Sequence, residues 1–189
     1  MRIHQGDPDQ LVDMVLSRTA DLAITTAPEN VPDELIMLPY RTWKLAAITL
    51  ADHPLQNVNP LTLESLAAYP LVTYDYAFAS RSSINTAFDE KGLMTNISLT
   101  AHDSDIIKTY VKLGLGVGLV AKSSIDEEKD SDLRVIDASH LFDSVTTYIC
   151  LHRGKHMRDY VYTLINYLSP EITRDVIEKA IIGDEEKSA

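Results

Sequence analysis

The sequence predicts an α/β fold in which strands alternate with helices and most neighbouring strands run parallel. Apolar runs of strand length alternate along the chain with amphipathic stretches of helical spacing. One stretch, residues 102–121, has the signals of a capped helix that leads directly into a buried strand. With 45% hydrophobic residues among 189, the chain can bury a sizeable core, and it shows no internal repeat.

The helix within residues 102–121 begins and ends with recognisable signals. Asp103 and Ser104 are good N-cap residues, and Gly114 can adopt the left-handed conformation that ends a helix. An apolar strand follows at 117–120. This order excludes a dinucleotide-binding loop, which needs its glycines between a strand and the following helix. The residues at helical spacing that we expect to face a core are Ile106, Ile107, Tyr110, Val111 and Leu113.

The remaining elements continue the alternation. Up to residue 60 we expect a strand at 2–5, a helix at 8–18, a strand at 21–25, a loop at 29–33, and strands at 35–38 and 45–50. Residues 61–101 should contain a helix at 61–68, a strand at 71–74, a helix at 82–91 ended by Gly92, and a strand at 97–100. After residue 121 we expect a solvated charged loop at 126–132, strands at 133–136 and 146–151, and helices at 158–168 and 172–182, the last one fraying into the C-terminal residues GDEEKSA.

Composition limits the partners that the chain itself can bind. Its 17 Lys and Arg against 28 Asp and Glu give a net charge of -11, which disfavours DNA, and the basic run at 152–158 is too short to change this. No stretch has the pattern of a membrane span or a secretory signal. The lone Cys150 lies in an apolar run and is expected to be a buried, reduced thiol. The chain either stays in the cytoplasm or has had a leader removed; the reduced thiol favours the cytoplasm, and no membrane partner is expected.

Catalytic and metal-binding patterns have little support. His152 and His156 are four residues apart, but no Glu completes a zinc-binding HExxH pattern, and the segment begins inside a predicted strand. No G-x-S-x-G elbow accompanies the Ser, His and Asp residues of the chain. Asp103 and Asp105 are two residues apart, so they do not share a helix face. We therefore expect no enzyme, no metal and no cofactor.

Three long stretches carry a family resemblance. They read HQGDPDQLVDMVLSRTADLAI at 4–24, YPLVTYDYAFASRSSINTAFDEKGL at 69–93, and HDSDIIKTYVKLGLGVGLVA at 102–121. Together they resemble the effector-binding domain of LysR-type transcription regulators, and more narrowly the CysB-like subgroup, which controls cysteine biosynthesis and sulfur assimilation. The resemblance covers nearly the whole chain.

The resemblance implies two Rossmann-like subdomains arranged as in type II periplasmic binding proteins, with a small ligand in the cleft between them. Subdomain I would consist of residues 1–41 plus 147–189, and subdomain II of residues 44–143. Ligands of such sheets bind at the carboxyl ends of strands, near helix N-termini that favour anions.

The resemblance also implies the ligand class: sulfate, thiosulfate, N-acetylserine or O-acetylserine. Thr26 matches a ligand-contacting hydroxyl, and its neighbour Thr25 is a second candidate. Trp43 matches an aromatic residue at the crossover. Ala79 stands where the family has a hydroxyl, and Ser80 beside it can supply the missing donor.

Each of these residues also has a structural interpretation. Thr25 and Thr26 suit a strand end, Trp43 suits a core, and Ser80 suits a helix cap. Arg81 is either a cation of the site or a solvated surface residue.

The resemblance further implies partners outside this sequence. The family's winged helix-turn-helix, which contacts DNA, and its linker helix, through which regulators form dimers or tetramers, have no counterpart in these residues. A strand and helix of the family's domain would precede Arg2, so we expect lower stability and weaker ligand binding than in the complete domain. A free solute-binding protein for a small anion would share this fold and is the alternative; it should carry an export signal.

Overall fold

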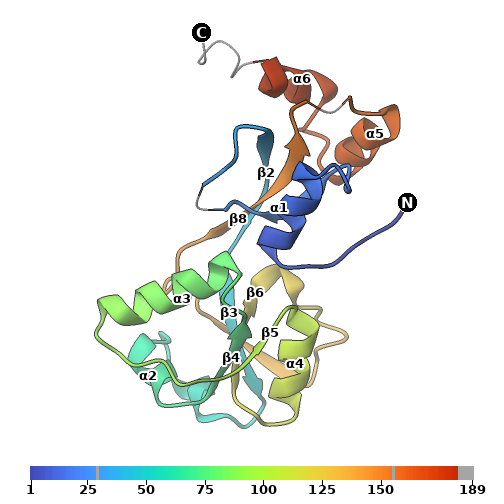
Figure 1. Cartoon of the computed structure of the whole chain (residues 1–189). Helices are drawn as coiled ribbons and strands as arrows, with labels where there is room; N and C mark the ends of the chain where they lie inside the picture. The colour runs from blue at the N-terminus through green and yellow to red at the C-terminus, as the bar shows by residue number, and fades with distance from the viewer. Residues whose placement is uncertain (29, 155, 183–189) are drawn as a thin grey trace. The chain divides into compact units, whose positions relative to one another are not determined.

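The computed structural model describes residues 1–28, 30–154 and 156–182, and the chain divides into two compact units. Unit 1 comprises Met1–Arg41 and Thr146–Ala189, and unit 2 comprises Thr42–Val145. Each unit has its own sheet with helices against it (Figure 1). Within the described ranges, no helix has the length and apolar character needed to cross a membrane.

Unit 1 is built on a three-stranded sheet in the order β1-β8-β2. β1 runs antiparallel to β8, with Thr26 opposite Thr147. One face packs against α1 through Val12, Val15 and Cys150. The other face packs against α5 and α6 through a second cluster that includes Ile149 and Ile165. The elements are α1 (Pro8–Leu16), β1 (Ala23–Thr26), β2 (Leu35–Trp43, which ends in unit 2), β8 (Val145–His152), α5 (Asp159–Leu168) and α6 (Arg174–Ile182).

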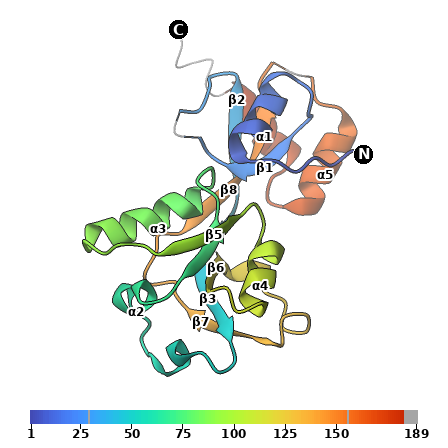
Figure 2. The same ribbon diagram turned by 60° about the horizontal axis from the view of Figure 1, so that its bottom comes forward.

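Unit 2 is built on a five-stranded sheet in the order β5-β4-β6-β3-β7. β4 is parallel to both β5 and β6, whereas β3 is antiparallel to β6 and β7. Figure 2 shows α3 on one side of this sheet and α4 on the other. The elements are β3 (Leu45–Leu50), η1 (Pro54–Asn57), α2 (Leu63–Ala67), β4 (Leu71–Tyr74), α3 (Ala79–Glu90), β5 (Ile97–Ala101), α4 (Ser104–Lys112), β6 (Val117–Ala121), η2 (Lys122–Ser124) and β7 (Leu133–Asp137).

The α/β fold is as predicted, but the expectation of mostly parallel sheets is wrong. Alternation of strands and helices gives parallel strands where a helix crosses over the same sheet, as α3 does between the neighbours β4 and β5 and α4 does from β5 across to β6. The antiparallel pairs β1–β8, β3–β6 and β3–β7 join segments far apart in the sequence. Periodicity carries no information about their direction.

The predicted strand at 2–5 is also wrong. Residues 1–5 are exposed and irregular. A strand persists only when a neighbour satisfies its backbone groups, and no described segment pairs with these residues. The predicted fraying at 183–189 and the first residue of the predicted loop at 29–33 lie outside the described residues.

The helix-strand unit at 102–121 forms with the predicted signals. Asp103 caps α4 by accepting a hydrogen bond from the Ile106 amide at 2.9 Å, and Gly114 follows the helix at φ +74°. Gly118 packs so tightly that a Cβ there would lie 2.5 Å from Ile48. The inward stripe is only partly correct, because Ile107 and Val111 are buried whereas Ile106 is 40% exposed and Leu113 67% exposed.

Most of the charged loop at 126–132 is exposed, as predicted, but Asp130 is buried in a charged network. Asp130 is 8% exposed, and its carboxylate accepts a hydrogen bond from Lys108 Nζ at 2.9 Å. Lys108 is itself buried on α4 and also donates to the Ser124 carbonyl at 2.8 Å. Burial alone would raise the pKa of Asp130, but the Lys108 and Asp126 hydrogen bonds and the Lys108 and Lys112 charges lower it below its ordinary value. Counting charges in sequence could not show that Lys108 would be buried opposite this loop.

The prediction for Cys150 is confirmed. The residue is fully buried in β8, and burial raises the pKa of its thiol to about 11. A thiol with this pKa stays protonated at neutral pH and is a poor nucleophile.

Candidate functional site

The candidate site in unit 2 is the carboxyl edge of its parallel strands, which we call the carboxyl edge. β4, β5 and β6 end there, and α3 and α4 begin there, because each helix follows one of these strands (Figure 2). In open α/β sheets this edge is where ligands bind. The residues around it come from sequence positions 43 to 121 but from a single folded unit.

Tyr74, the last residue of β4, joins the elements of this edge. Its side chain is buried, and its hydroxyl lies 2.8 Å from Ser104 Oγ at the start of α4. The same hydroxyl accepts a hydrogen bond from the Ala121 amide at the end of β6, at 3.1 Å. Tyr74 therefore holds the start of α4 and the end of β6 in fixed positions beside β4.

A row of ring side chains lines the carboxyl edge, and we call it the aromatic row. Trp43 lies 6.4 Å from Tyr74 between ring centroids, and Tyr74 lies 5.8 Å from Phe78. Phe78 meets His102 edge-to-face at 5.9 Å. Trp43 and Phe78 are partly buried against the core of unit 2, so they combine packing with a surface that a ligand could contact.

Helix α3 begins at Ala79, three residues earlier than predicted. Its N-cap residue Phe78 has no side chain able to cap it, in contrast to Asp7, Thr62 and Asp103 at α1, α2 and α4. The amides of the first turn of a helix have no partner inside the helix. The start of α3 therefore offers Ala79 and Ser80 amides to an anion, and Ala79 contributes no hydroxyl.

Ser80 lies inside the first turn of α3, so the alternative that it caps the helix is wrong. Ser80 is 2% exposed at the start of α3. Its hydroxyl is not among the buried side-chain oxygens that lack a hydrogen-bond partner in the described residues.

Arg81 is not a solvated surface residue. It is 3% exposed, its Nε donates to Asn85 Oδ1 at 3.1 Å, and one terminal nitrogen donates to the Tyr74 carbonyl at 3.4 Å. Its guanidinium also lies over the Tyr76 ring, 4.1 Å from the centroid. Arg81 thus connects the end of β4 to α3 through these hydrogen bonds, and it places a positive charge next to the start of α3.

Thr25 and Thr26 lie at the end of β1 in unit 1, and both are buried. Successive strand residues point to opposite faces of a sheet. Thr25 therefore shares the α1 face with Ala23, whereas Thr26 shares the α5 face with Ile24. The Thr25 hydroxyl is buried without a hydrogen-bond partner among the described residues.

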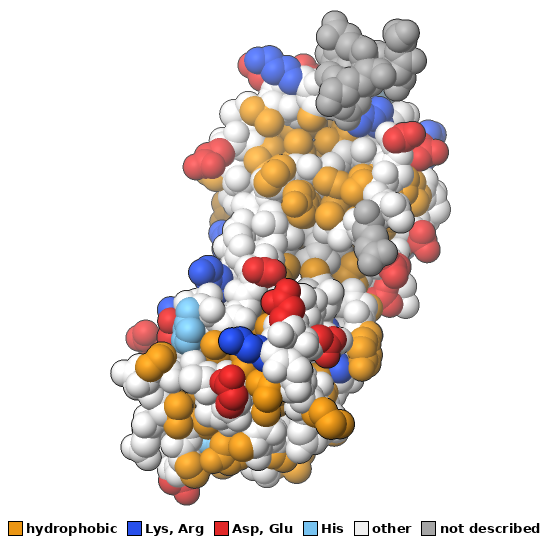
Figure 3. Space-filling view, turned by 90° about the vertical axis from the view of Figure 1, so that its left-hand side faces the viewer, with side chains coloured by type: hydrophobic (Ala, Val, Ile, Leu, Met, Phe, Trp, Pro, Cys, Tyr) orange, Lys and Arg blue, Asp and Glu red, His pale blue; other side chains and the backbone are white. Residues whose placement is uncertain are grey.

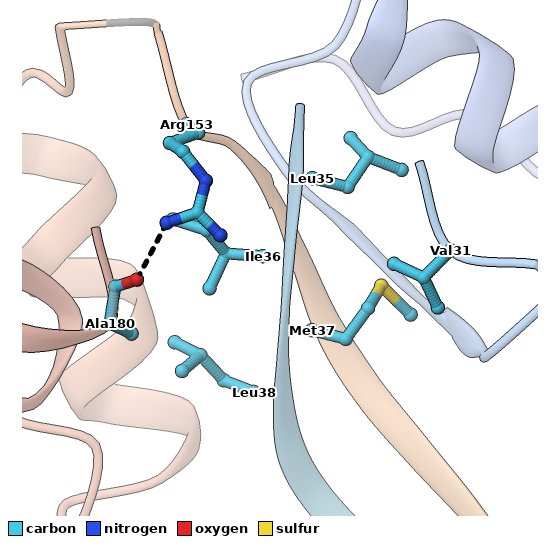
Figure 4. Close-up of a pocket in the computed structure, with 7 residues that line it drawn as sticks. All are labelled: Val31, Leu35, Ile36, Met37, Leu38, Arg153 and Ala180. Carbon is cyan, nitrogen blue, oxygen red and sulfur yellow. Dashed lines mark hydrogen bonds between the residues drawn. The ribbon is translucent and has the colours of Figure 1, made fainter. Parts of the chain in front are cut away.

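A separate pocket lies on β2 at the opposite edge of the unit 1 sheet from Thr25 and Thr26. Its volume is about 360 Å³, and Figure 3 shows hydrophobic side chains gathered on this unit. Arg153 donates to the carbonyls of Ala180 and Ile181 at 2.9 and 2.8 Å and so holds the last turn of α6 (Figure 4). The Arg153 guanidinium is used to hold these backbone carbonyls. The other residues that line the pocket are uncharged. The lining residues are Val31, Leu35, Ile36, Met37, Leu38, Arg153 and Ala180.

The His152 ring lies beside Arg18 and Gly154. His152 Nδ1 accepts a hydrogen bond from the Gly154 amide at 3.0 Å, and its Nε2 lies 3.4 Å from Arg18 Nε. In the part of the chain that the structure describes, no group of three or more His, Cys, Asp or Glu side chains is arranged to hold a metal ion.

Sequence reasoning named Trp43, Ala79 and Ser80 but missed Tyr74, Asp75 and His102. Their common signal is position: they stand at or directly after the ends of predicted parallel strands, where the next helix begins. Polar or aromatic residues at such positions point to a binding edge. The structure brings Trp43, Ala79 and Ser80 to this edge of unit 2, and Thr25 and Thr26 belong to unit 1.

A comparison with family models identifies this architecture. The model described as "LysR substrate binding domain" matches residues 1–172. The chain belongs to this LysR substrate-binding family. The domains of this family belong to transcription regulators, not enzymes, so the prediction of no enzyme is confirmed by membership.

Similar proteins support a narrower placement within the LysR family. The chain is 48% identical over 186 residues to the HTH-type transcriptional regulator CysB of Burkholderia cenocepacia, covering 98% of the chain and 59% of that regulator. It is 46% identical to CysB of Haemophilus influenzae, covering 95% of the chain and 55% of that regulator. The chain thus spans somewhat more than half the length of these relatives. The predicted CysB-like resemblance is confirmed.

Solved structures agree with the fold. The cofactor-binding domain of the Cbl transcriptional regulator matches with a TM-score of 0.87 and 38% identity, over 94% of this chain and 78% of that one. The effector-binding domain of QuiR, solved with shikimate, matches with a TM-score of 0.77 at 17% identity, over 92% of this chain and 81% of that one. The second likeness shows the shared LysR effector-domain fold alone.

Proposed function

We propose that this chain is the effector-sensing domain of a LysR-type regulator of sulfur assimilation and cysteine biosynthesis. The effector would be sulfate, thiosulfate, N-acetylserine or O-acetylserine. It would bind at the carboxyl edge of unit 2, and Thr25 and Thr26 of unit 1 stay predicted ligand-binding residues. The identity to two CysB regulators supports the pathway.

One observation carries the proposal for the site. The start of α3 combines an uncapped helix N-terminus with the hydroxyl-bearing residue Ser80, next to the aromatic row. Oriented amides and hydroxyls hold an oxyanion or a carboxylate through charge-assisted hydrogen bonds. The ring side chains provide apolar contact for an acetyl group. All four candidate effectors carry the negative oxygens that such a site requires.

The wider regulatory role follows from the family. We infer that the intact regulator works in the cytoplasm as a homo-oligomer, a dimer or tetramer, and contacts DNA through a region outside these residues. An effector changes such a regulator by binding one of two arrangements more tightly, which shifts their populations. The acidic balance of this chain fits a sensing part that does not itself hold DNA.

Calorimetric titration of the chain with each of the four compounds tests the proposal. We expect saturable binding of at least one compound, weakened roughly tenfold to a hundredfold in Ser80→Ala and in Thr26→Val, since each loses a hydrogen bond to a charged ligand. Ser82→Ala is the matched control, because Ser82 is exposed on the same helix. Silence from all four compounds, or equal affinity in Ser80→Ala and wild type, would contradict the proposal.

A further inference from the structure

His53 caps the short helix η1, which follows β3 in unit 2. The backbone of His53 is extended, and its Nδ1 accepts a hydrogen bond from the Leu55 amide at 3.2 Å. The His53 amide donates to the Leu50 carbonyl at 3.3 Å, and the Gln56 amide donates to the His53 carbonyl at 3.0 Å. His53 therefore joins the end of β3 to the start of η1.

The capped segment covers part of the core of unit 2. Leu55 is 1% exposed and belongs to the main core cluster of this unit. The His53 ring packs edge-to-face against Tyr69, with the ring centroids 4.5 Å apart, and Tyr69 is partly buried against the same cluster. The imidazole thus contributes both a hydrogen bond and a ring contact that keep Leu55 in the core.

The cap requires a neutral imidazole. A ring nitrogen accepts a hydrogen bond only while it carries no proton, and both nitrogens of an imidazolium are donors. The side chains that cap α1, α2 and α4 are Asp7, Thr62 and Asp103, whose oxygens remain acceptors between pH 5 and 8. Of the side chains that cap these four helices, His53 alone can change its charge in this range.

The surroundings of the ring disfavour its protonation. Burial lowers the pKa of His53 below its ordinary value of 6.5, and the Asp52 carboxylate raises it by a smaller amount. In the part of the chain that the structure describes, the titratable groups that act on the ring or touch it are Asp52 of the same turn and Tyr69 between α2 and β4. A ring released into water binds a proton more readily, so acidification favours release.

We propose that His53 is a proton-sensitive cap: its neutral imidazole holds η1 and Leu55 in the core of unit 2, and protonation releases this segment. The cap contributes fully above about pH 6.5 and loses its contribution as the pH falls from there through the lower pKa of the folded state. The last residues of β3 lie beside the start of β6, so η1 is at the opposite edge of the sheet from the carboxyl edge. The inference therefore does not depend on effector binding.

Amide exchange of Leu55 and Val58, followed by NMR between pH 7.5 and 4.5 and corrected for intrinsic exchange, tests the proposal. We expect protection to begin to fall near pH 6.5 and to fall roughly fivefold in total, the factor for the loss of one cap. His53→Asn should show no fall above pH 5, because asparagine caps through an oxygen that does not titrate. His102→Asn is the control and should behave like the wild type, since it replaces a histidine whose side chain is 58% exposed.

Two results with the wild-type chain would overturn the proposal, whether or not a variant folds. One is constant protection of Leu55 over the whole range, and the other is a fall that begins only below pH 5, where carboxylates take up protons. A fall in His53→Asn equal to that of the wild type would overturn it as well.

Discussion

Replacing Lys108 by methionine should destabilise unit 2 strongly, because it leaves Asp130 as a buried charge. Lys108 Nζ lies 2.9 Å from Asp130 Oδ2 and 2.8 Å from the Ser124 carbonyl, and its side chain is 8% exposed. In the variant, the Asp126 amide at 3.1 Å and the Lys112 ammonium at 3.6 Å remain beside Asp130. The ion pair with Asp105 adds little, since that carboxylate is 91% exposed.

The magnitude follows from these contacts. Removing one member of a buried ion pair costs about 3–5 kcal/mol of unfolding free energy. Since the Asp126 amide and the Lys112 ammonium remain beside Asp130, we expect a loss of unfolding free energy at the lower end of this range, about 3 kcal/mol. For a chain of 189 residues this corresponds to a fall in Tm of roughly 6–12 °C.

Urea unfolding followed by circular dichroism measures this change. Lys112→Met is the matched control and should cost less than about 1 kcal/mol, because its side chain is 32% exposed and lies farther from Asp130. The double variant Lys108→Met/Asp130→Leu should recover most of the loss, since no charge is then left buried. Equal stability of Lys108→Met and Lys112→Met, or a double variant less stable than Lys108→Met, would refute the reasoning.

The pH dependence of the same pair has a definite sign. The pKa of Asp130 is lowered in the folded state, so its contribution is present above the unfolded value, about 4, and disappears as the pH falls through the folded value. The pKa of Lys108 is raised: burial alone would lower it, but the hydrogen bonds to Asp130 and Asp105 outweigh burial. Its contribution is present below about 10 and is lost as the pH rises through the folded value.

Three further substitutions or modifications test the packing. Gly118→Ala should cost about 1–3 kcal/mol in urea unfolding, because its Cβ would meet Ile48 at 2.5 Å; an unchanged midpoint would contradict the close packing. Thr25→Val should leave stability equal or up to about 1 kcal/mol higher, because it removes an unpaired buried hydroxyl, while effector binding weakens; a stability loss above about 1 kcal/mol would show that the hydroxyl has a partner. Cys150 should react with a thiol reagent at neutral pH only after unfolding, and rapid labelling of the native chain would contradict its burial.

Local signals predicted those parts of the fold that depend on local physics. The sequence predicted the Asp103 cap, the turn at Gly114 and the buried strand after it, because helix capping and chain reversal involve residues a few positions apart. The sequence could not predict that β3 and β8 run antiparallel to their neighbours, since these strands pair with segments distant in the sequence. The strand expected at 2–5 failed for a related reason: a strand depends on a neighbour, not on its own pattern.

The candidate site was predictable where the sequence carried a family motif and not where contacts span elements. Thr26, Trp43 and Ala79 could be named from matching strings, and Ser80 as the neighbour of Ala79. The hydroxyl of Tyr74 gains its importance only when β6 and the start of α4 arrive beside it, which no periodicity reveals. The burial of Arg81 likewise depends on α3 beginning at Ala79, a start that lacks any capping side chain to signal it.

Fluorescence of Trp43 tests the central claim most directly, because it is the only tryptophan of the chain and belongs to the aromatic row. Titration with sulfate, thiosulfate, N-acetylserine and O-acetylserine should produce a saturable change in emission with at least one compound. That change should weaken in Ser80→Ala and persist in Ser82→Ala. Emission that stays constant with all four compounds, or a response equally strong in Ser80→Ala, would contradict an effector site at the carboxyl edge of unit 2.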